Sequence, residues 1–257
     1  MPMHGYRAIL EKEVIEAWRT YRIVLLSALF VGLGIAAPVL ARYLPDLTAA
    51  FGPPGAEIEV TETGLPDVVD LLLGSLVQVG ALASLLMTMG VVATEKARGT
   101  AALVLARPVG RAAFLWAKLV GLGMQFGLAI GLGVLATWLY STLLFGPQPV
   151  LGWGQLALVV WLSTMVYVSI TFLGSVVADS PLGAAAVGLT GIVVLTLAST
   201  VSSLGPWLPT GLTEVAKSLV LEEASTDLDP ARTVAISIAV IVVSTLLAWW
   251  RFRRQEI

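Results

Sequence analysis

Apolar residues along this chain gather in six long runs separated by shorter polar segments. A helix needs about 20 mostly apolar residues to cross the hydrocarbon core of a bilayer, and each run has about that length or more. The runs lie at about 23–44, 68–93, 113–145, 155–177, 182–204 and 233–250. This pattern predicts an all-α, polytopic membrane protein with six transmembrane helices, folded as a single transmembrane domain over residues 1–257.

The segment ahead of the first run has a different pattern. Over residues 6–22, large apolar side chains recur at helical spacing, and charged residues fill the other side. The apolar positions are Tyr6, Leu10, Val14, Trp18 and Tyr21. The pattern predicts an amphipathic helix in the membrane interface, with a soluble amphipathic tail as the alternative. The first apolar run begins only near Ile23 and is too long for a signal peptide, so we expect it to remain as an anchor.

Composition supports the membrane class and excludes several chemistries. The chain is 57% hydrophobic and only 12% charged, about half of the roughly 25% charged residues typical of soluble domains. It has no cysteine, and its one histidine is His4, so metal or haem sites built from these residues are not expected. Charged residues avoid the middle of the runs, and Lys118 and Asp70, near run ends, can extend toward the headgroups. We therefore expect no catalytic, cofactor or metal site in this chain, and no nucleic-acid partner.

Lysine and arginine set the orientation. In a six-span arrangement, all but three of the 15 basic residues fall on one side of the membrane. The exceptions are Arg42, Lys217 and Arg232. Because basic residues favour the cytoplasmic side, both termini are expected in the cytoplasm.

The two longer segments on the other side are acidic. They cover about 45–67 and 205–231. Glycine and proline interrupt residues 205–211, so this stretch is too broken to span the membrane. We expect a broken, re-entrant outer segment before the sixth span, and the acidic segments suit an extracytoplasmic protein partner.

Small residues occur at regular spacing in the third span. Gly123, Gly127 and Gly131 are four residues apart and share one helix face. Such a face lets two membrane helices approach closely. The spacing predicts helix packing, with a seam that allows the helices to slide during a conformational change as the subordinate alternative.

The segment between the second and third spans, about 94–118, is too long for a tight turn. Thr100 is suited to cap a short amphipathic helix over residues 101–106, and Arg107-Pro108 would end it. Basic residues and a leucine ridge indicate a docking surface. An ordinary loop whose positive charge only fixes topology is the alternative.

The order of residues in this segment resembles permeases of the ATP-binding-cassette (ABC) transporters, within the type-2 export class. That family typically shows glutamate, Gly-Thr, a leucine-rich short helix, proline, arginine and then lysine as the third span begins. The matching positions here are Glu95, Gly99-Thr100, Leu103, Leu105, Pro108, Arg111 and Lys118. The six spans, the N-terminal helix and the broken outer segment extend the likeness over nearly the whole chain. The outer segment 45–67 is longer than in the simplest members, which leaves the substrate open.

The resemblance implies an ATP-driven exporter in the cytoplasmic (inner) membrane of a prokaryote. Such permeases pair, as a homodimer in the simplest case, and bind two copies of a separate ATPase subunit that carries ATP and Mg²⁺. The helix at 101–106 would be the coupling helix, and the turn at Asp179-Ser180 a second contact with the ATPase. The residues assigned to docking are Glu95, Arg98, Gly99, Thr100, Leu103, Arg107, Pro108, Arg111, Asp179 and Ser180. The alternatives are a non-transporting ABC-type subunit that acts on an extracytoplasmic protein and an ATP-independent secondary transporter. The chain has no phosphate-binding loop of the Gly-x-x-x-x-Gly-Lys-Ser/Thr type, so ATP hydrolysis is expected elsewhere.

Overall fold

A computed structural model describes residues 3–51, 64–100, 110–201, 205, 208–221 and 229–255. Within these ranges the regular structure is helical, and six helices are long and apolar enough to cross a membrane. These findings confirm the all-α class and the six spans. The short helix expected at 101–106 lies outside the described residues, as does most of the acidic segment 45–67.

The six spanning helices are α2, α3, α6, α7, α8 and α10, and their bounds follow the apolar runs. They cover Arg22–Phe51, Leu65–Thr88, Arg111–Phe145, Val150–Val177, Pro181–Ser199 and Pro230–Arg253. In the described ranges three shorter helices accompany them, namely α1 (Met3–Arg19), α4 (Ala93–Ala97) and α9 (Leu212–Leu221), and a 3₁₀ turn, η2, covers Pro209–Gly211. Span two differs from the expected helix because it is broken: α3 ends at Thr88, and α4 starts after a turn.

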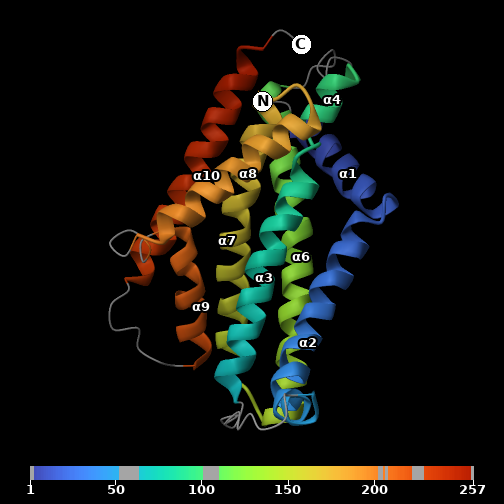
Figure 1. Ribbon diagram of the computed structural model, residues 1–257. Coiled ribbons are helices and arrows are strands. Elements are labelled where there is room, and N and C mark those ends of the chain that lie inside the picture. The colour runs from blue at the N-terminus through green and yellow to red at the C-terminus, as the bar shows by residue number, and fades with distance from the viewer. Residues whose placement is uncertain are drawn as a thin grey trace.

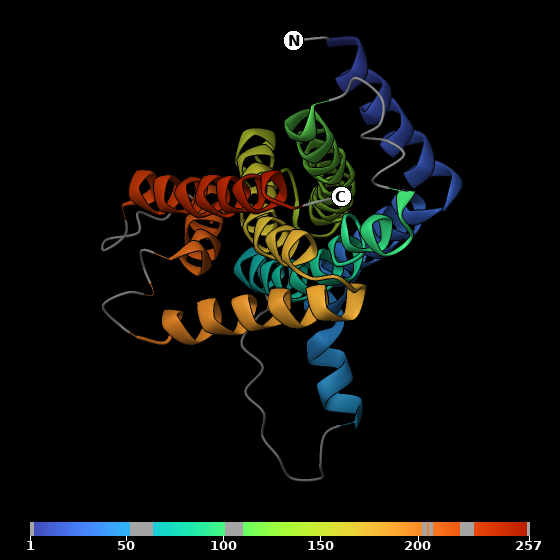
Figure 2. The ribbon, with the colours of Figure 1, turned by 90° about the horizontal axis from the view of Figure 1, so that it is seen from above.

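Helices α3, α6 and α7 run side by side through the bundle, with α2 packed along α6 (Figure 1). Helices α8 and α10 pack on α7 and lean away from the bundle axis, as the view along that axis shows (Figure 2). Both chain termini lie at one end of the bundle, which we call the terminal end. Helices α1 and α4 lie at this end, and α9 lies toward the opposite end beside α7.

Helices α2 and α6 cross with their backbones in contact. A Cβ atom at Gly133 would lie 2.7 Å from the carbonyl oxygen of Phe30, and one at Gly34 would overlap the carbonyl oxygen of Gly133. Any side chain at either position would push the two helices apart. This crossing fixes the position of the first span against the third.

The glycines expected to pack span three have different surroundings. Gly123 and Gly127 lie under the indole ring of Trp161 in α7, whose Nε1 donates a hydrogen bond to the Gly123 carbonyl oxygen at 2.9 Å. Around Gly131, nothing lies within 4 Å of where a Cβ would stand. The closest approach of another helix to α6, that of α2, is therefore at Gly133, two residues after Gly131.

At the opposite end, α9 is held against its neighbours. A Cβ at Gly152 of α7 would lie 2.6 Å from the carbonyl oxygen of Leu219, so the two helices are in close contact. Lys217 of α9 also forms an ion pair with Asp70 of α3 at 2.8 Å. The described part of the outer segment is thus packed on the bundle, and its re-entry into the membrane stays a prediction.

The α2–α6 crossing generates a matched pair of substitutions. We expect Gly133→Ala to lower the free energy of unfolding by about 1–3 kcal/mol, because its methyl group meets a backbone carbonyl that no rotamer can move. Gly131→Ala, on the same helix but in open space, should be neutral or slightly stabilising. Unfolding of the purified protein in mixed micelles measures both; equal effects at the two positions would contradict the crossing.

Candidate functional site

Lys118 is buried where three helices meet at the terminal end. It lies about two turns into α6, and its side chain is only 2% exposed. Its Nζ atom is 2.9 Å from Glu13 Oε1 of α1 and 2.9 Å from Glu95 Oε1 of α4. Because an unpaired ammonium group is very costly to bury, these two carboxylates are what permits a lysine here. The ammonium group of Lys118 therefore has its partners inside the protein, and its extension toward the headgroups stays a prediction.

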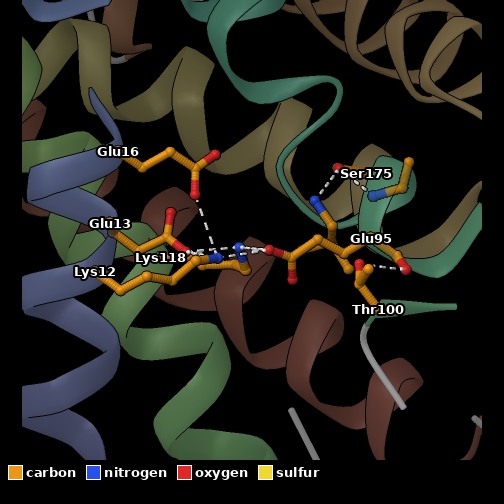
Figure 3. A network of polar contacts seen from close by, with 9 residues as sticks. Lys12, Glu13, Glu16, Glu95, Thr100, Lys118 and Ser175 are labelled. Atoms are coloured by element: carbon orange, nitrogen blue, oxygen red, sulfur yellow. Dashed lines mark hydrogen bonds and ion pairs between the residues drawn. The ribbon is translucent and has the colours of Figure 1, made fainter. Parts of the chain in front are cut away.

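A second lysine completes the group. Lys12 Nζ lies 3.1 Å from Glu95 Oε1, 3.3 Å from Glu16 Oε2 and 3.5 Å from Glu13 Oε1. We call Lys12, Glu13, Glu16, Glu95 and Lys118 the charge cluster (Figure 3). Partial burial lowers the pKa of Lys12. The carboxylates around it, above all Glu95, raise the pKa by more than burial lowers it, so the pKa of Lys12 lies above its usual range. Lys12 therefore stays charged at every physiological pH.

The sequence of α1 explains how Glu13 reaches Lys118. Ile9, Glu13 and Ala17 follow one another at four-residue spacing, so they share a face, and Ile9 and Ala17 are buried. This face packs on α6 at Gly121, where an added Cβ would lie 3.3 Å from the Cβ of Glu13. Of the residues expected to form the apolar face of α1, Tyr6 and Leu10 pack partly on the core, whereas Val14, Trp18 and Tyr21 are exposed. A place for this helix in the membrane interface stays a prediction.

The turn between α3 and α4 is held by a single hydroxyl group from α7. Ser175 Oγ accepts hydrogen bonds from the backbone N–H groups of Val92 at 3.0 Å and Ala93 at 3.1 Å. It also donates to the carbonyl oxygen of Met89 at 2.9 Å. Backbone groups that lose their partners at a helix break need such replacements when they are buried. Ser175 thus stabilises the break in the second span (Figure 3).

Lys96 of α4 binds the end of α7. Its Nζ atom donates to the carbonyl oxygens of Val176 and Ala178, both at 3.0 Å. A cation is favoured there because the last carbonyl groups of a helix are unpaired and carry the negative end of its dipole. The same Nζ atom lies 3.1 Å from Asp179 Oδ1. These bonds bring the segment after span two and the turn after span four together.

The start of α6 binds the end of α10 in a similar way. Arg111 donates to the carbonyl oxygens of Arg253 at 2.8 Å and Gln255 at 3.0 Å. One turn further on, the rings of Phe114 and Phe252 stack with centroids 5.6 Å apart. The third and sixth spans are therefore joined at the terminal end.

The residues expected to dock an ATPase fall into three groups in the structure. Glu95 and Arg111 contact other helices of the same chain, as described above. Thr100 donates to the Glu95 carbonyl oxygen at 3.2 Å, and Ser180 accepts from the Gly183 N–H at 3.1 Å as the N-cap of α8. Arg98, Gly99 and Asp179 are exposed. Leu103, Arg107 and Pro108 lie outside the described residues.

Sequence reasoning missed five contributors to this site: Lys12, Glu13, Glu16, Lys96 and Ser175. The first three were assigned only to the polar side of an amphipathic helix. A signal existed in the spacing of Ile9, Glu13 and Ala17, which places an acid among small and apolar residues and so calls for a cationic partner. Nothing local to Ser175 indicates its role, because its partners are more than 80 residues away.

Comparisons with known proteins agree with this architecture. The family model described as "ABC-2 family transporter protein" matches residues 7–257, and the chain belongs to that family. Membership implies an ABC-type permease with an ABC ATPase as its partner. The chain is also similar to the "uncharacterized transmembrane protein YxlG" of Bacillus subtilis (strain 168), with 27% identity over 260 residues covering 97% of each chain.

Removing the shared cation tests the charge cluster. We expect Lys118→Met to lower the free energy of unfolding by about 3–5 kcal/mol, because it leaves Glu13 and Glu95 partly buried without their main partner. Lys12→Met should cost about 1 kcal/mol or less, because Lys12 is half exposed and Lys118 remains. Unfolding titrations in mixed micelles compare the two; a Lys118→Met variant as stable as Lys12→Met would count against the pairing.

Proposed function

We propose that this chain is the permease subunit of an ATP-driven exporter, with its terminal end in the cytoplasm. A separate ATPase subunit binds and hydrolyses ATP there. Its movement is transmitted to the spans, which change conformation and release a substrate outward. This chain itself has no enzymatic role in the proposal.

The observation that carries the proposal is the way α4 is held. Glu95 contacts α1 and α6 through the two lysines, and Lys96 contacts the end of α7. The residues that follow α4 lead directly into the segment whose motif resembles a coupling helix. A force applied to that segment would therefore act on three helices together rather than on one flexible loop.

A second feature supports one continuous docking face. Asp179 and Ser180, expected as a smaller ATPase contact, follow the last carbonyl groups of α7 that Lys96 binds. The helix that leads into the first expected contact, α4, thus lies beside the second. An ATPase subunit seated on one of them would also meet the other.

The proposal extends to a pair of permeases with two ATPase subunits, as in the family it resembles. Helix α8 supports this arrangement because it is the least covered span of the described chain, with only Ala184 and Gly188 buried. A second copy, lipid or both would cover the remainder.

Gly99 offers a test that leaves the charge cluster intact. Its φ of +70° reverses the chain after α4, and its N–H donates to the Lys96 carbonyl oxygen at 3.0 Å. Proline fixes φ near −65° and has no N–H, so Gly99→Pro should redirect the following segment. Co-expressed with ABC ATPases from the same genome, this variant should lose most of the copurifying ATPase and of the stimulated ATP turnover.

Gly110→Pro is the matched control, because Gly110 already has a φ of −67° and lies at the other end of the same segment. It should retain the complex. If Gly99→Pro binds and stimulates the ATPase as the unaltered chain does, the docking role is wrong. Transport by the chain alone in proteoliposomes, with no ATPase present, would instead favour an ATP-independent transporter.

A further inference from the structure

The charge cluster borders a cavity of about 670 Å³ at the terminal end. Three spans contribute to it at the points where they begin or end. Arg22 is the first residue of α2, Met87 is the next-to-last of α3 and Pro181 is the first of α8. The cavity therefore lies at the boundary between the apolar spans and the polar end of the bundle, which is the level of the lipid headgroups.

The aromatic residues near α2 support this level. Trp18 and Tyr21, at the corner between α1 and α2, are 64% and 68% exposed. Tyr21 has a φ of +57°, and this left-handed residue turns the chain from α1 into α2. Tryptophan and tyrosine side chains concentrate at the headgroup level of membranes. The corner that carries Arg22 is thus built as an interfacial anchor.

The charges around the cavity leave a cationic excess. Glu13, Glu16 and Glu95 line it, but each is already paired with Lys12, Lys118 or both. The other two charged residues of the lining are arginines, Arg22 and Arg98. Neither has an ion pair or hydrogen bond from its side chain among the described residues, and both are exposed. The guanidinium groups are therefore available for an anion, and guanidinium is well suited to bind phosphate through paired hydrogen bonds.

Apolar side chains form the other part of the lining. Leu86 and Met87, on the last turn of α3, contribute, and Leu86 is 65% exposed. A ligand that matches both the arginines and the apolar side chains of the lining has an anionic group and a long apolar tail. A soluble anion would leave these side chains uncovered.

We propose that this cavity binds one anionic phospholipid of the adjacent leaflet. The phosphate group lies between Arg22 and Arg98, and an acyl chain follows Leu86 and Met87 along α3. Basic pockets between membrane helices recognise anionic headgroups in this way. The inference concerns the isolated chain and does not depend on whether an ATPase docks to it.

Native mass spectrometry of the purified full chain tests the proposal. Delipidated protein in an uncharged detergent is titrated with dioleoyl-phosphatidylglycerol or dioleoyl-phosphatidylcholine. We expect one tightly held phosphatidylglycerol per chain and much weaker retention of phosphatidylcholine. In the double variant R22Q/R98Q, affinity for phosphatidylglycerol should fall roughly thirtyfold, because each basic residue near a headgroup contributes about 1 kcal/mol.

Arg19→Gln is the matched control, because Arg19 is exposed at the same corner but does not line the cavity. It should bind phosphatidylglycerol as the unaltered chain does, and single R22Q should lose about fivefold. The proposal is overturned if both lipids bind alike, if R22Q/R98Q retains full affinity, or if millimolar inorganic phosphate displaces the lipid completely. Because no ATPase is present, failure here leaves the docking proposal untouched.

Discussion

A lysine ammonium group that is withdrawn from water has to be surrounded by acceptors, and in this protein the acceptors come from two different segments. Lys118 recruits Glu13 from α1 and Glu95 from α4. Helix α1 is thereby fixed across the foot of α6, although a soluble tail was a reasonable alternative from its sequence. The ion pair with Glu95 fixes α4 as well. The position of α4 in turn sets the direction in which the chain leaves the second span. The arrangement of the whole terminal end depends on this one cation.

The other contacts at the terminal end repeat the same physical solution. A helix that ends inside a bundle leaves carbonyl groups unpaired, and the chain supplies a cation for two such ends. Lys96 binds the end of α7, and Arg111 binds the end of α10. Because both cations lie beside the start or end of another span, satisfying a backbone group also joins two helices. Neutral donors would satisfy the carbonyl groups but would not match the helix dipole.

Much of the fold was predictable because it is encoded locally. Six apolar runs give six spans, and caps such as Asp229 before Pro230 set their ends within a few residues. The break at residues 89–92 was not predictable in this way, since Met89, Val91 and Val92 continue the apolar run. The backbone groups at the break are satisfied by Ser175, which belongs to another helix. The candidate site shows the same limit. The motif located Glu95 and Lys118, but only the folded chain shows that these two residues pair with each other and that α1 supplies Glu13 and Lys12 as their further partners.

The glycines of span three show why spacing alone was insufficient there. A four-residue repeat identifies a smooth face, and Gly123 and Gly127 do accommodate a neighbour, the indole of Trp161. The repeat does not say which helix approaches most closely. That helix is α2, and it meets α6 at Gly133 because Gly34 arrives at the same height. A matching glycine on a second run was the missing information.

The meeting of Gly34 and Gly133 has a mechanical consequence. Two backbones that touch without intervening side chains leave no room for even one methyl group between them, so the contact cannot be adjusted by a change of rotamer. The contact lies well inside both helices, away from their ends. It therefore sets the smallest separation that the first and third spans can have, and the rest of their packing is arranged around it.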